Sequence, residues 1–379
     1  MTSDASGQPV ISAWSALSPW GEGAAAFREG LGTGREALSV VDSEFRPGTS
    51  LRAGIVPGVR MEYAGTRGVR SLDRLTRLTL LLSGLLLDDQ GGSTGTEPED
   101  TGMVFATSGS AKSGLDFTTA SYAEAKPFHV DPSRFPSTAA NCAASRSAIW
   151  YGLKGPNTTL TGGDVGGLLA LAQAGRLLRQ GRAEVLLAGA GEEYTEDRVL
   201  LEDALRGGPG QAPPLAEGGA LFLLESAEGA AARGRTPLAV LRGSRFRAYH
   251  PERGGSAGQA LLRCVTDLLG ETGTDPGAIG LTVSSDPSGP LGAQEDAALA
   301  EVFARAGAQA GAGAGARAGA PARRIAPAHR IGHGGSAASA FQTAAALAAD
   351  GEGPLRAPVL ITSVEEGRVG ATLLGRPAG

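Results

Sequence analysis

Short apolar runs alternate along the chain with segments whose apolar residues recur at helical spacing. The apolar runs predict buried strands at 10–14, 102–108, 157–161, 184–193, 219–226, 237–246, 280–285 and 357–364. The segments with helical spacing predict helices at 70–89, 113–125, 164–179, 256–273, 295–307 and 335–350. Because strands and helices alternate, we expect an α/β protein with a largely parallel, buried sheet.

The alternation runs through the chain twice. We therefore expect two halves of similar construction, an N-terminal half over 1–235 and a C-terminal half over 236–379. Residues 307–324 contain almost only Ala, Gly and Arg, and such low complexity predicts a flexible surface loop without chemistry.

Composition excludes several classes of function. The net charge of −5 gives no general attraction to nucleic acid or to anionic lipid. The most apolar stretch, LTLLLSGLLL at 78–87, is too short to cross a bilayer, and the first residues lack the pattern of a signal peptide. Two cysteines and four histidines form no metal-ligand pattern, so we expect no metal, no disulfide and a cytoplasmic protein.

One stretch, GPNTTLTGGDVGGLLAL at 155–171, predicts a strand, a tight turn and a helix. Gly162 and Gly163 permit the turn, and two further glycines at 166–167 permit close packing beneath it. Such an elbow exposes one side chain at the start of a helix, where backbone N–H groups can bind an oxyanion. Here that side chain is Asp164, a carboxylate rather than an ordinary nucleophile.

Several motifs around the elbow resemble those of the β-ketoacyl synthases. They are FPSTAANCAASRSAIWYGLKGPN at 135–157, AGAGEE at 188–193, AEGGALFLLE at 216–225 and RIGHGGSAAS at 330–339. Together they cover most of the chain at plausible spacing. The resemblance implies a thiolase-like fold, in which two related βα halves form a layered αβαβα arrangement.

The chain departs from that family at its reactive positions. Asp164 stands where the family has its cysteine, and Ser285 stands where it has its first histidine. Ala328 replaces the family's lysine, and residues 365–368 (EEGR) replace a glycine-rich turn that shapes the oxyanion hole. Of these positions only His333, the second histidine, is kept.

A ketosynthase stores the growing acyl chain as a thioester on its cysteine. A carboxylate would instead form a mixed anhydride that hydrolyses, and it would repel the anionic malonyl group. We therefore predict no catalytic residue in this chain, with Asp164, Ser285 and His333 as degenerate positions.

A branch of the family with a replaced cysteine is the chain-length factor, or ketosynthase-β subunit, of type II polyketide synthases. Its elbow carries Gln followed by x-GGLxAL, and this chain keeps all of that except the Gln. The resemblance implies a heterodimer with a catalytic ketosynthase and a substrate carried on the phosphopantetheine of an acyl carrier protein, with no cofactor of its own. Asp in place of Gln favours relatives that serve reducing, polyene-forming systems.

In chain-length factors a helix after the second conserved strand lines the shared tunnel. The matching positions are Leu115, Thr118 and Tyr122, which fall at i, i+3 and i+7 on one helical face. If this face lines the tunnel, Tyr122 acts as a stop and Leu115 narrows the bore, because one more extension unit would overpack a rigid wall.

Plainer readings of these residues stay open. Asp164 is a good helix N-cap residue, and His333 is kept for packing at a helix start in the same view. Leu115, Thr118 and Tyr122 are then ordinary core residues, and the Glu pair at 365–366 is a solvated turn. We expect Cys142 to be a buried structural thiol, and the remaining histidines to lie at the surface or to be satisfied within the fold: His129, His250 and His329.

Two other functions are open on the sequence alone. One is a stand-alone malonyl decarboxylase or acyl hydrolase that uses Asp164 and His333. The other is a homodimeric pseudoenzyme that only binds acyl carrier protein.

Overall fold

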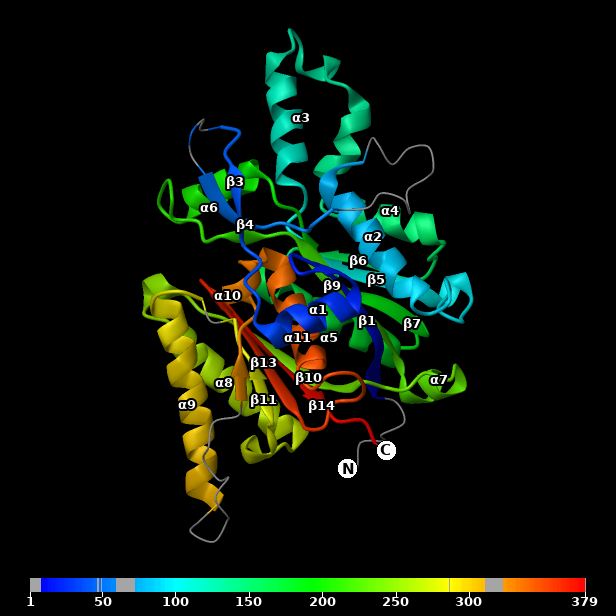
Figure 1. Cartoon of the computed structure of the whole chain (residues 1–379), viewed down its shortest axis with the longest axis vertical. Helices are drawn as coiled ribbons and strands as arrows, with labels where there is room; N and C mark the ends of the chain where they lie inside the picture. The colour runs from blue at the N-terminus through cyan, green and yellow to red at the C-terminus, as the bar shows by residue number, and fades with distance from the viewer. Residues whose placement is uncertain are drawn as a thin grey trace.

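The computed structural model describes residues 8–45, 48, 50–58, 72–285, 287–310 and 323–378. Within these residues, most strands belong to one large mixed sheet (Figure 1). Its first group of five strands comprises β1 (Pro9–Ser18), β5 (Thr101–Ala106), β6 (Asn157–Leu160), β7 (Val185–Glu192) and β9 (Gly218–Ser226). Its second group comprises β10 (Ala239–Ala248), β11 (Leu281–Val283), β12 (Arg323–Ile325), β13 (Val359–Glu365) and β14 (Arg368–Gly375).

The two groups have the same topology. Counted from the junction, the spatial order is β1-β9-β7-β5-β6 on one side and β10-β14-β13-β11-β12 on the other. Moving outward from the junction, each group therefore shows its first, fifth, fourth, second and third strands, numbered by their order along the chain. The junction itself is the antiparallel pair β1–β10, in which Val10 lies opposite Val240 and Ile11 opposite Ala239.

The sheet is not largely parallel, and that expectation is wrong. In each group the second, third and fourth strands run parallel, whereas the first and fifth pair antiparallel with their neighbours. The strands at the centre of the first group, β1, β5, β7 and β9, are buried along nearly their whole length and therefore largely apolar, and this hides from the sequence the direction in which each of them runs.

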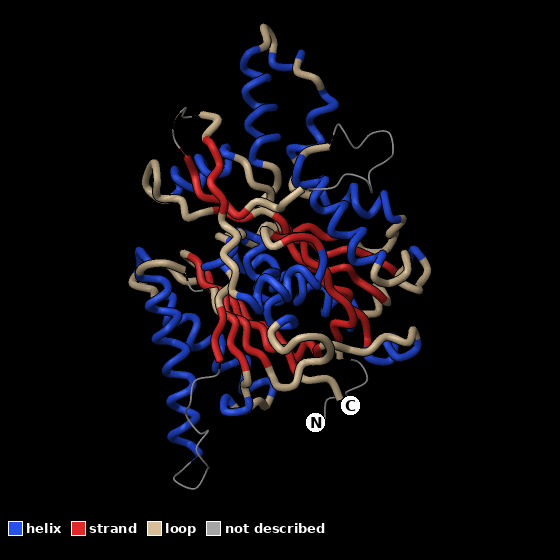
Figure 2. Tube along the Cα trace, in the orientation of Figure 1, coloured by secondary structure: helices blue, strands red, loops and turns tan. Residues whose placement is uncertain are grey.

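Helices cover both faces of each group of strands, which gives the layered αβαβα arrangement (Figure 2). The central layer contains α5 (Gly166–Arg179) and α11 (Ala338–Ala348), and α1 (Gly23–Thr33) packs against α11. The outer layers contain α2 (Arg74–Asp88) with α4 (Cys142–Tyr151), and α8 (Ala257–Thr272) with α9 (Pro290–Ala310).

The central layer is packed closely because small residues face each other. A Cβ on Gly167 would collide with the backbone of Ala340, so α5 and α11 cross in near contact. Gly166 likewise lies against Ala106 and Ser336, as expected for close packing beneath the elbow. Beside this crossing, the rings of Phe27 and Phe341 stack with centroids 6.1 Å apart.

Further elements lie above the sheet edge. A small sheet joins β3 (Ser39–Asp42), β4 (Ser50–Gly54) and β8 (Leu215–Ala216), next to α6 (Glu196–Leu205). Helix α3 (Ala111–Ala123) and the short helical turns Pro127–His129 and Pro132–Thr138 project from the body in Figure 1. The remaining elements are β2 (Gly21–Glu22), α7 (Ala227–Ala232), α10 (Ala328–Ile331) and the single turns Pro98–Asp100, Gly163–Val165, Pro251–Arg253, Pro276–Ala278 and Gly335–Ala337.

The predicted low-complexity loop is shorter than expected. Helix α9 continues to Ala310, and β12 begins at Arg323. The rest of the 307–324 segment lies outside the described residues. Among the residues that the structure describes, no helix is both long enough and apolar enough to span a membrane.

Candidate functional site

The elbow forms where the sequence predicts it. Strand β6 ends at Leu160, Gly163 adopts a left-handed conformation with φ +60°, and a single 3₁₀ turn over Gly163–Val165 leads into α5. The N-cap of α5 is Val165, and its side chain makes no capping hydrogen bond. The reading of Asp164 as a helix cap is therefore wrong.

The second half builds an equivalent turn. After β12 and α10, the chain reaches His333, then Gly335 with φ +55°, a 3₁₀ turn over Gly335–Ala337 and the start of α11. The main chain of His333 is anchored to the small sheet: its N–H donates to Pro214 O (2.8 Å), and its C=O accepts from Ala216 N (2.9 Å). Because α5 and α11 cross just below, the two turns face each other.

Asp164 and His333 meet between these turns. His333 Nε2 lies 2.8 Å from Asp164 Oδ2, and the two side chains are only 19% and 15% exposed. Burial lowers the pKa of His333, but the charge and the hydrogen bond of Asp164 together outweigh burial and raise this pKa above its usual value. The pair thus favours an imidazolium that donates to a carboxylate, and Asp164 is occupied by this contact.

Ser285, at the position of the missing histidine, is turned to structural use. Its backbone N–H and its hydroxyl both donate to the carboxylate of the fully buried Glu295, at 3.2 and 3.1 Å. The same hydroxyl accepts the backbone N–H of Val364 (3.0 Å). With its hydroxyl proton and a lone pair engaged, Ser285 offers a substrate no free donor.

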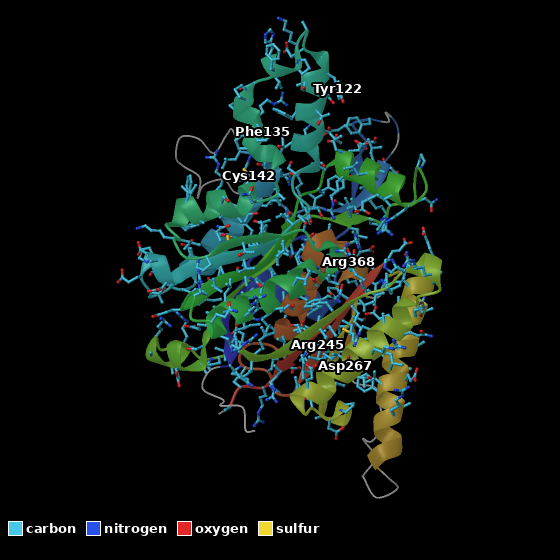
Figure 3. The ribbon with its side chains drawn as sticks, turned by 180° about the vertical axis from the view of Figure 1, so that it is seen from behind. Tyr122, Phe135, Cys142, Arg245, Asp267 and Arg368 are labelled. Atoms are coloured by element: carbon cyan, nitrogen blue, oxygen red, sulfur yellow. The ribbon has the colours of Figure 1, made fainter. Side chains whose placement is uncertain are left out.

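The hairpin between β13 and β14 closes over the elbow. Glu365 ends β13, and its carboxylate lies directly against Gly163 of the elbow, where a Cβ would collide with both of its oxygens. Arg368 donates from Nη1 to Gly162 O (2.9 Å), and its Nε lies 3.1 Å from Glu365 Oε1 (Figure 3). Burial, reinforced by the charge of Asp164, raises the pKa of Glu365 to about 7. The solvated-turn reading thus holds for the exposed Glu366 and is wrong for Glu365.

A cavity of about 260 Å³ opens in front of the Asp164–His333 pair. The structure brings together here the four positions at which reactive residues were expected: Asp164, Ser285, Ala328 and His333. Most of the remaining lining is apolar and includes Ile331 and Phe341. The cavity keeps the location of an active site, but it contains no thiol and only one histidine on the functional positions.

Two buried charged residues near the pair were not singled out from the sequence. Glu192, at the end of β7, is fully buried and accepts the backbone N–H groups of Ser108 (2.7 Å) and Ser336 (3.3 Å). Arg198 donates from Nη1 to Glu193 O (2.9 Å), and its positive charge opposes protonation of His333. The sequence does contain a signal for the buried glutamate, because a Glu-Glu pair stands at the end of both β7 and β13.

The predicted tunnel residues lie on the projecting helix, and none is buried. Leu115 is 38% exposed and Tyr122 86% exposed, and the hydroxyl of Thr118 donates to Gly114 O. The core reading of these three residues is therefore wrong, whereas their role in a tunnel stays a prediction. Figure 3 shows Tyr122 and Phe135 on the projection, away from the elbow.

More large apolar side chains are exposed on the elements that follow α3 in the chain. They lie on the two short helical turns after α3 and on α4: Phe128, Phe135, Ile149 and Trp150. The rings of Phe117 and Phe135 contact edge to face at 5.7 Å, which ties α3 to the returning segment. We call these six exposed residues, Leu115 and Tyr122 included, the apolar projection surface. Large apolar side chains left exposed to water are candidates for a protein interface.

A second cavity of about 410 Å³ lies at the base of α3. Its lining is polar and includes Ser113, Asp116 and Tyr194. The buried Glu193 also faces it, where burial raises the pKa of this carboxyl to about 7 although Ser110 donates a hydrogen bond to it.

The remaining expectations concern cysteines and histidines. Both cysteines are free, as predicted. Cys142 is only partly buried, at the start of α4, so the prediction of a buried thiol is wrong; its Sγ lies 3.9 Å from Thr76 Oγ1. The three other histidines lie at the surface, as expected: His129, His250 and His329.

Comparison with known proteins adds to this geometry. Residues 9–204 match the model of the β-ketoacyl synthase N-terminal domain. The chain is 32% identical over 299 residues to a putative polyketide β-ketoacyl synthase 2 of Streptomyces virginiae, covering 70% of this chain and 71% of the relative. It is 27% identical over 311 residues to 3-oxoacyl-[acyl-carrier-protein] synthase 2 of Vibrio harveyi, covering 74% of each.

Solved structures agree over nearly the whole chain. The ishigamide ketosynthase/chain length factor superimposes with a TM-score of 0.83 at 35% identity, covering 98% of this chain and 100% of the other. AntDE:AntF, a type II polyketide synthase acyl carrier protein in complex with its ketosynthase, superimposes with a TM-score of 0.74 at 18% identity, covering 98% and 99%. The second likeness concerns the fold alone.

Proposed function

The chain belongs to the β-ketoacyl synthase family and has its thiolase-like fold, and on this premise we propose that it is a non-catalytic chain-length factor. In this role it pairs with a catalytic ketosynthase, and the two subunits together enclose the tunnel in which a polyketide grows on acyl carrier protein. A polyene product is part of the proposal.

The observation that carries the proposal is the state of the elbow. Condensation needs a nucleophile that holds an acyl group and donors that stabilise an enolate. Asp164 is engaged by His333 at 2.8 Å, and the hydroxyl of Ser285 is directed at Glu295. The fold of a ketosynthase is thus kept while its reactive groups are used within the protein.

The apolar projection surface supports the partner. A second subunit packed against its six exposed side chains would remove them from water, which is favourable for apolar groups. Permanent interfaces of this kind commonly bury about 2,000 Å² or more. A catalytic ketosynthase seated there would face Leu115, Thr118 and Tyr122, which would then line the space between the subunits.

No observation favours a stand-alone decarboxylase or hydrolase. A decarboxylase of this family type would need two donors at the cavity, and Ser285 does not supply the second one. An Asp164–His333 hydrolase would need an activated water that this pairing does not itself provide.

Reconstitution tests the proposed function. The chain should copurify with a ketosynthase that has an intact cysteine and two histidines, and the complex should extend malonyl units while the chain alone should not.

Tyr122→Ala should shift the products of the complex toward longer chains, as measured by mass spectrometry. The matched control is Asp116→Ala, which is partly exposed on the same helix but lies on a different face from the three predicted residues, and which should leave product length unchanged. A stable monomer that ignores ketosynthases, or elongation by the chain alone, would contradict the proposal.

A further inference from the structure

Two carboxylates at equivalent positions support the two central turns. Glu192 is the last residue of the fourth strand in the first half, and it accepts the N–H of Ser336 in the turn of the second half. Glu365 is the last residue of the fourth strand in the second half, and its carboxylate lies against Gly163 in the elbow. Each half thus places one carboxylate against the turn of the other.

A glycine in each turn makes room for a charged side chain: the carboxylate of Glu365 at Gly163, and the guanidinium of Arg198 at Gly335. A Cβ on Gly163 would collide with both carboxylate oxygens of Glu365. A Cβ on Gly335 would lie 2.6 Å from Arg198 Nη2 and 3.7 Å from Glu192 Cγ. Both glycines have positive φ, so the space and the backbone conformation are matched in the two turns.

Arg368 strengthens the contact at the elbow. Its Nη1 donates to Gly162 O, so the tip of the β13–β14 hairpin contacts three consecutive residues of the elbow, 162–164. Glu365 is held in turn, because Arg368 Nε lies 3.1 Å from its Oε1 and Tyr249 donates to its backbone carbonyl (2.9 Å). The carboxylate is therefore fixed over the elbow by its neighbours.

We infer that Glu365 is a second block on the elbow, independent of the missing thiol, because its carboxylate lies against Gly163 and fills the space beside the backbone N–H that an oxyanion would need. The inference rests on the proposed function, in which this site does not carry acyl groups. It follows that restoring a cysteine at position 164 is not sufficient to restore acyl transfer.

The chemistry explains why the block is effective. A thiolate at position 164 that attacks a thioester forms a new S–C bond and a tetrahedral oxyanion, and the old thiol then leaves with a proton. The oxyanion requires the N–H of residue 164, and removal of one such donor commonly costs about 10²–10³ in rate. Glu365 fills the space beside this donor, and its negative charge opposes both the oxyanion and the thiolate.

The experiment uses the full chain in complex with a ketosynthase whose own nucleophilic cysteine is replaced by alanine. Cys142→Ala removes the partly exposed thiol. In this background D164C, D164C/E365Q and D164C/E365G are compared. The probe is the hexanoyl thioester of N-acetylcysteamine, and intact-mass spectrometry measures the acyl adduct on the chain. A parallel reaction with iodoacetamide measures thiolate availability without any need for an oxyanion site.

Distinct results are expected from the two substitutions. E365Q removes the charge but leaves an acceptor near the N–H, so it should raise alkylation and acylation by similar factors. E365G also clears the space beside the N–H, so it should raise acylation at least tenfold more than it raises alkylation. E366Q is the matched control: this neighbouring carboxylate is exposed, and its loss should change both rates less than twofold.

The outcomes separate the two proposals. If D164C is acylated as fast as D164C/E365G, the block by Glu365 is refuted while the proposed function stands. If the unmodified chain alone elongates malonyl units, the proposed function fails whatever Glu365 does. Copurification with the ketosynthase reports folding, and D164C/E365A replaces the glycine variant if that variant does not assemble.

Discussion

The elbow at Asp164 and its counterpart at His333 share one backbone plan, yet their supporting carboxylates lie in different surroundings. Glu192 is fully buried and accepts two backbone N–H groups. Glu365 retains 20% side-chain exposure, pairs with the exposed Arg368 and borders the cavity residue Asp164. The first carboxylate is part of the core, whereas the second lies at a hairpin tip beside the elbow.

This difference teaches which parts of the site are free to change. A carboxylate that satisfies buried N–H groups cannot be removed without leaving them unpaired. A carboxylate at a partly exposed hairpin tip can be gained or lost at small cost, since water and Arg368 stand nearby. We therefore expect the chemistry of this fold to vary at the tip and the elbow, and its support to persist at Glu192.

The largest expected effect follows from removing Glu192. Glu192→Ala leaves the N–H groups of Ser108 and Ser336 without an acceptor in the core, and should lower the free energy of unfolding by about 3 kcal/mol. Glu365→Ala should change it by less than about 1 kcal/mol at pH 7. Urea unfolding of both variants under identical conditions measures the contrast, and equal losses would show that the two turns are supported alike.

A smaller effect concerns pH. The pKa of Glu365 is raised from its ordinary value to about 7, so the folded protein keeps this proton up to a higher pH than the unfolded chain does. Its contribution to stability is therefore greatest below about pH 4.5 and falls as the pH rises to 7. Glu365→Gln cannot lose a proton, so it lacks this pH dependence. Between about pH 4.5 and pH 7, its free energy of unfolding should therefore rise by about 2 kcal/mol relative to that of the original protein. Urea unfolding at several pH values measures the difference, and Glu366→Gln should show none.

The smallest effect is local. Asp164→Asn removes the negative charge that favours the imidazolium and leaves only a neutral amide acceptor, while burial and the charge of Arg198 still disfavour it. The pKa of His333 should therefore fall below that of an ordinary histidine, and the pKa of Glu365 should fall as well because a neighbouring negative charge is lost. An NMR titration of the His333 ring measures the first shift. An unchanged titration would mean that the pair does not form in solution.

Much of the fold could be predicted from the sequence, because burial leaves continuous apolar runs and helix stripes. Strand direction could not, since strands buried on both faces look alike whichever way they run. Helix α1 (GAAAFREGLGT) was missed because alanine and glycine dominate it and only Phe27 and Gly30 are buried. Strand β14 was missed because it follows β13 after only two residues, where no further element was expected.

The elbow could be predicted because its glycines and strand are adjacent in sequence. The Asp164–His333 contact could not, because it joins positions 169 residues apart through the packing of α5 on α11. The resemblance did place both residues at one degenerate site, and the structure brings them to one cavity. The role of Glu365 was missed because the contact between the hairpin tip and the elbow becomes visible only once the two halves are packed together.

The crossing of α5 and α11 at Gly167 and Ala340 has a consequence for how such proteins diverge. Both helices begin at the turns that carry Asp164 and His333, so a single missing methyl group fixes the spacing of the two side chains. The crossing of α5 and α11 fixes the distance between the two turns. Whichever residues occupy positions 164 and 333 are therefore brought together. The elbow can therefore carry an acid where related proteins have a thiol without any change in the helices that hold it.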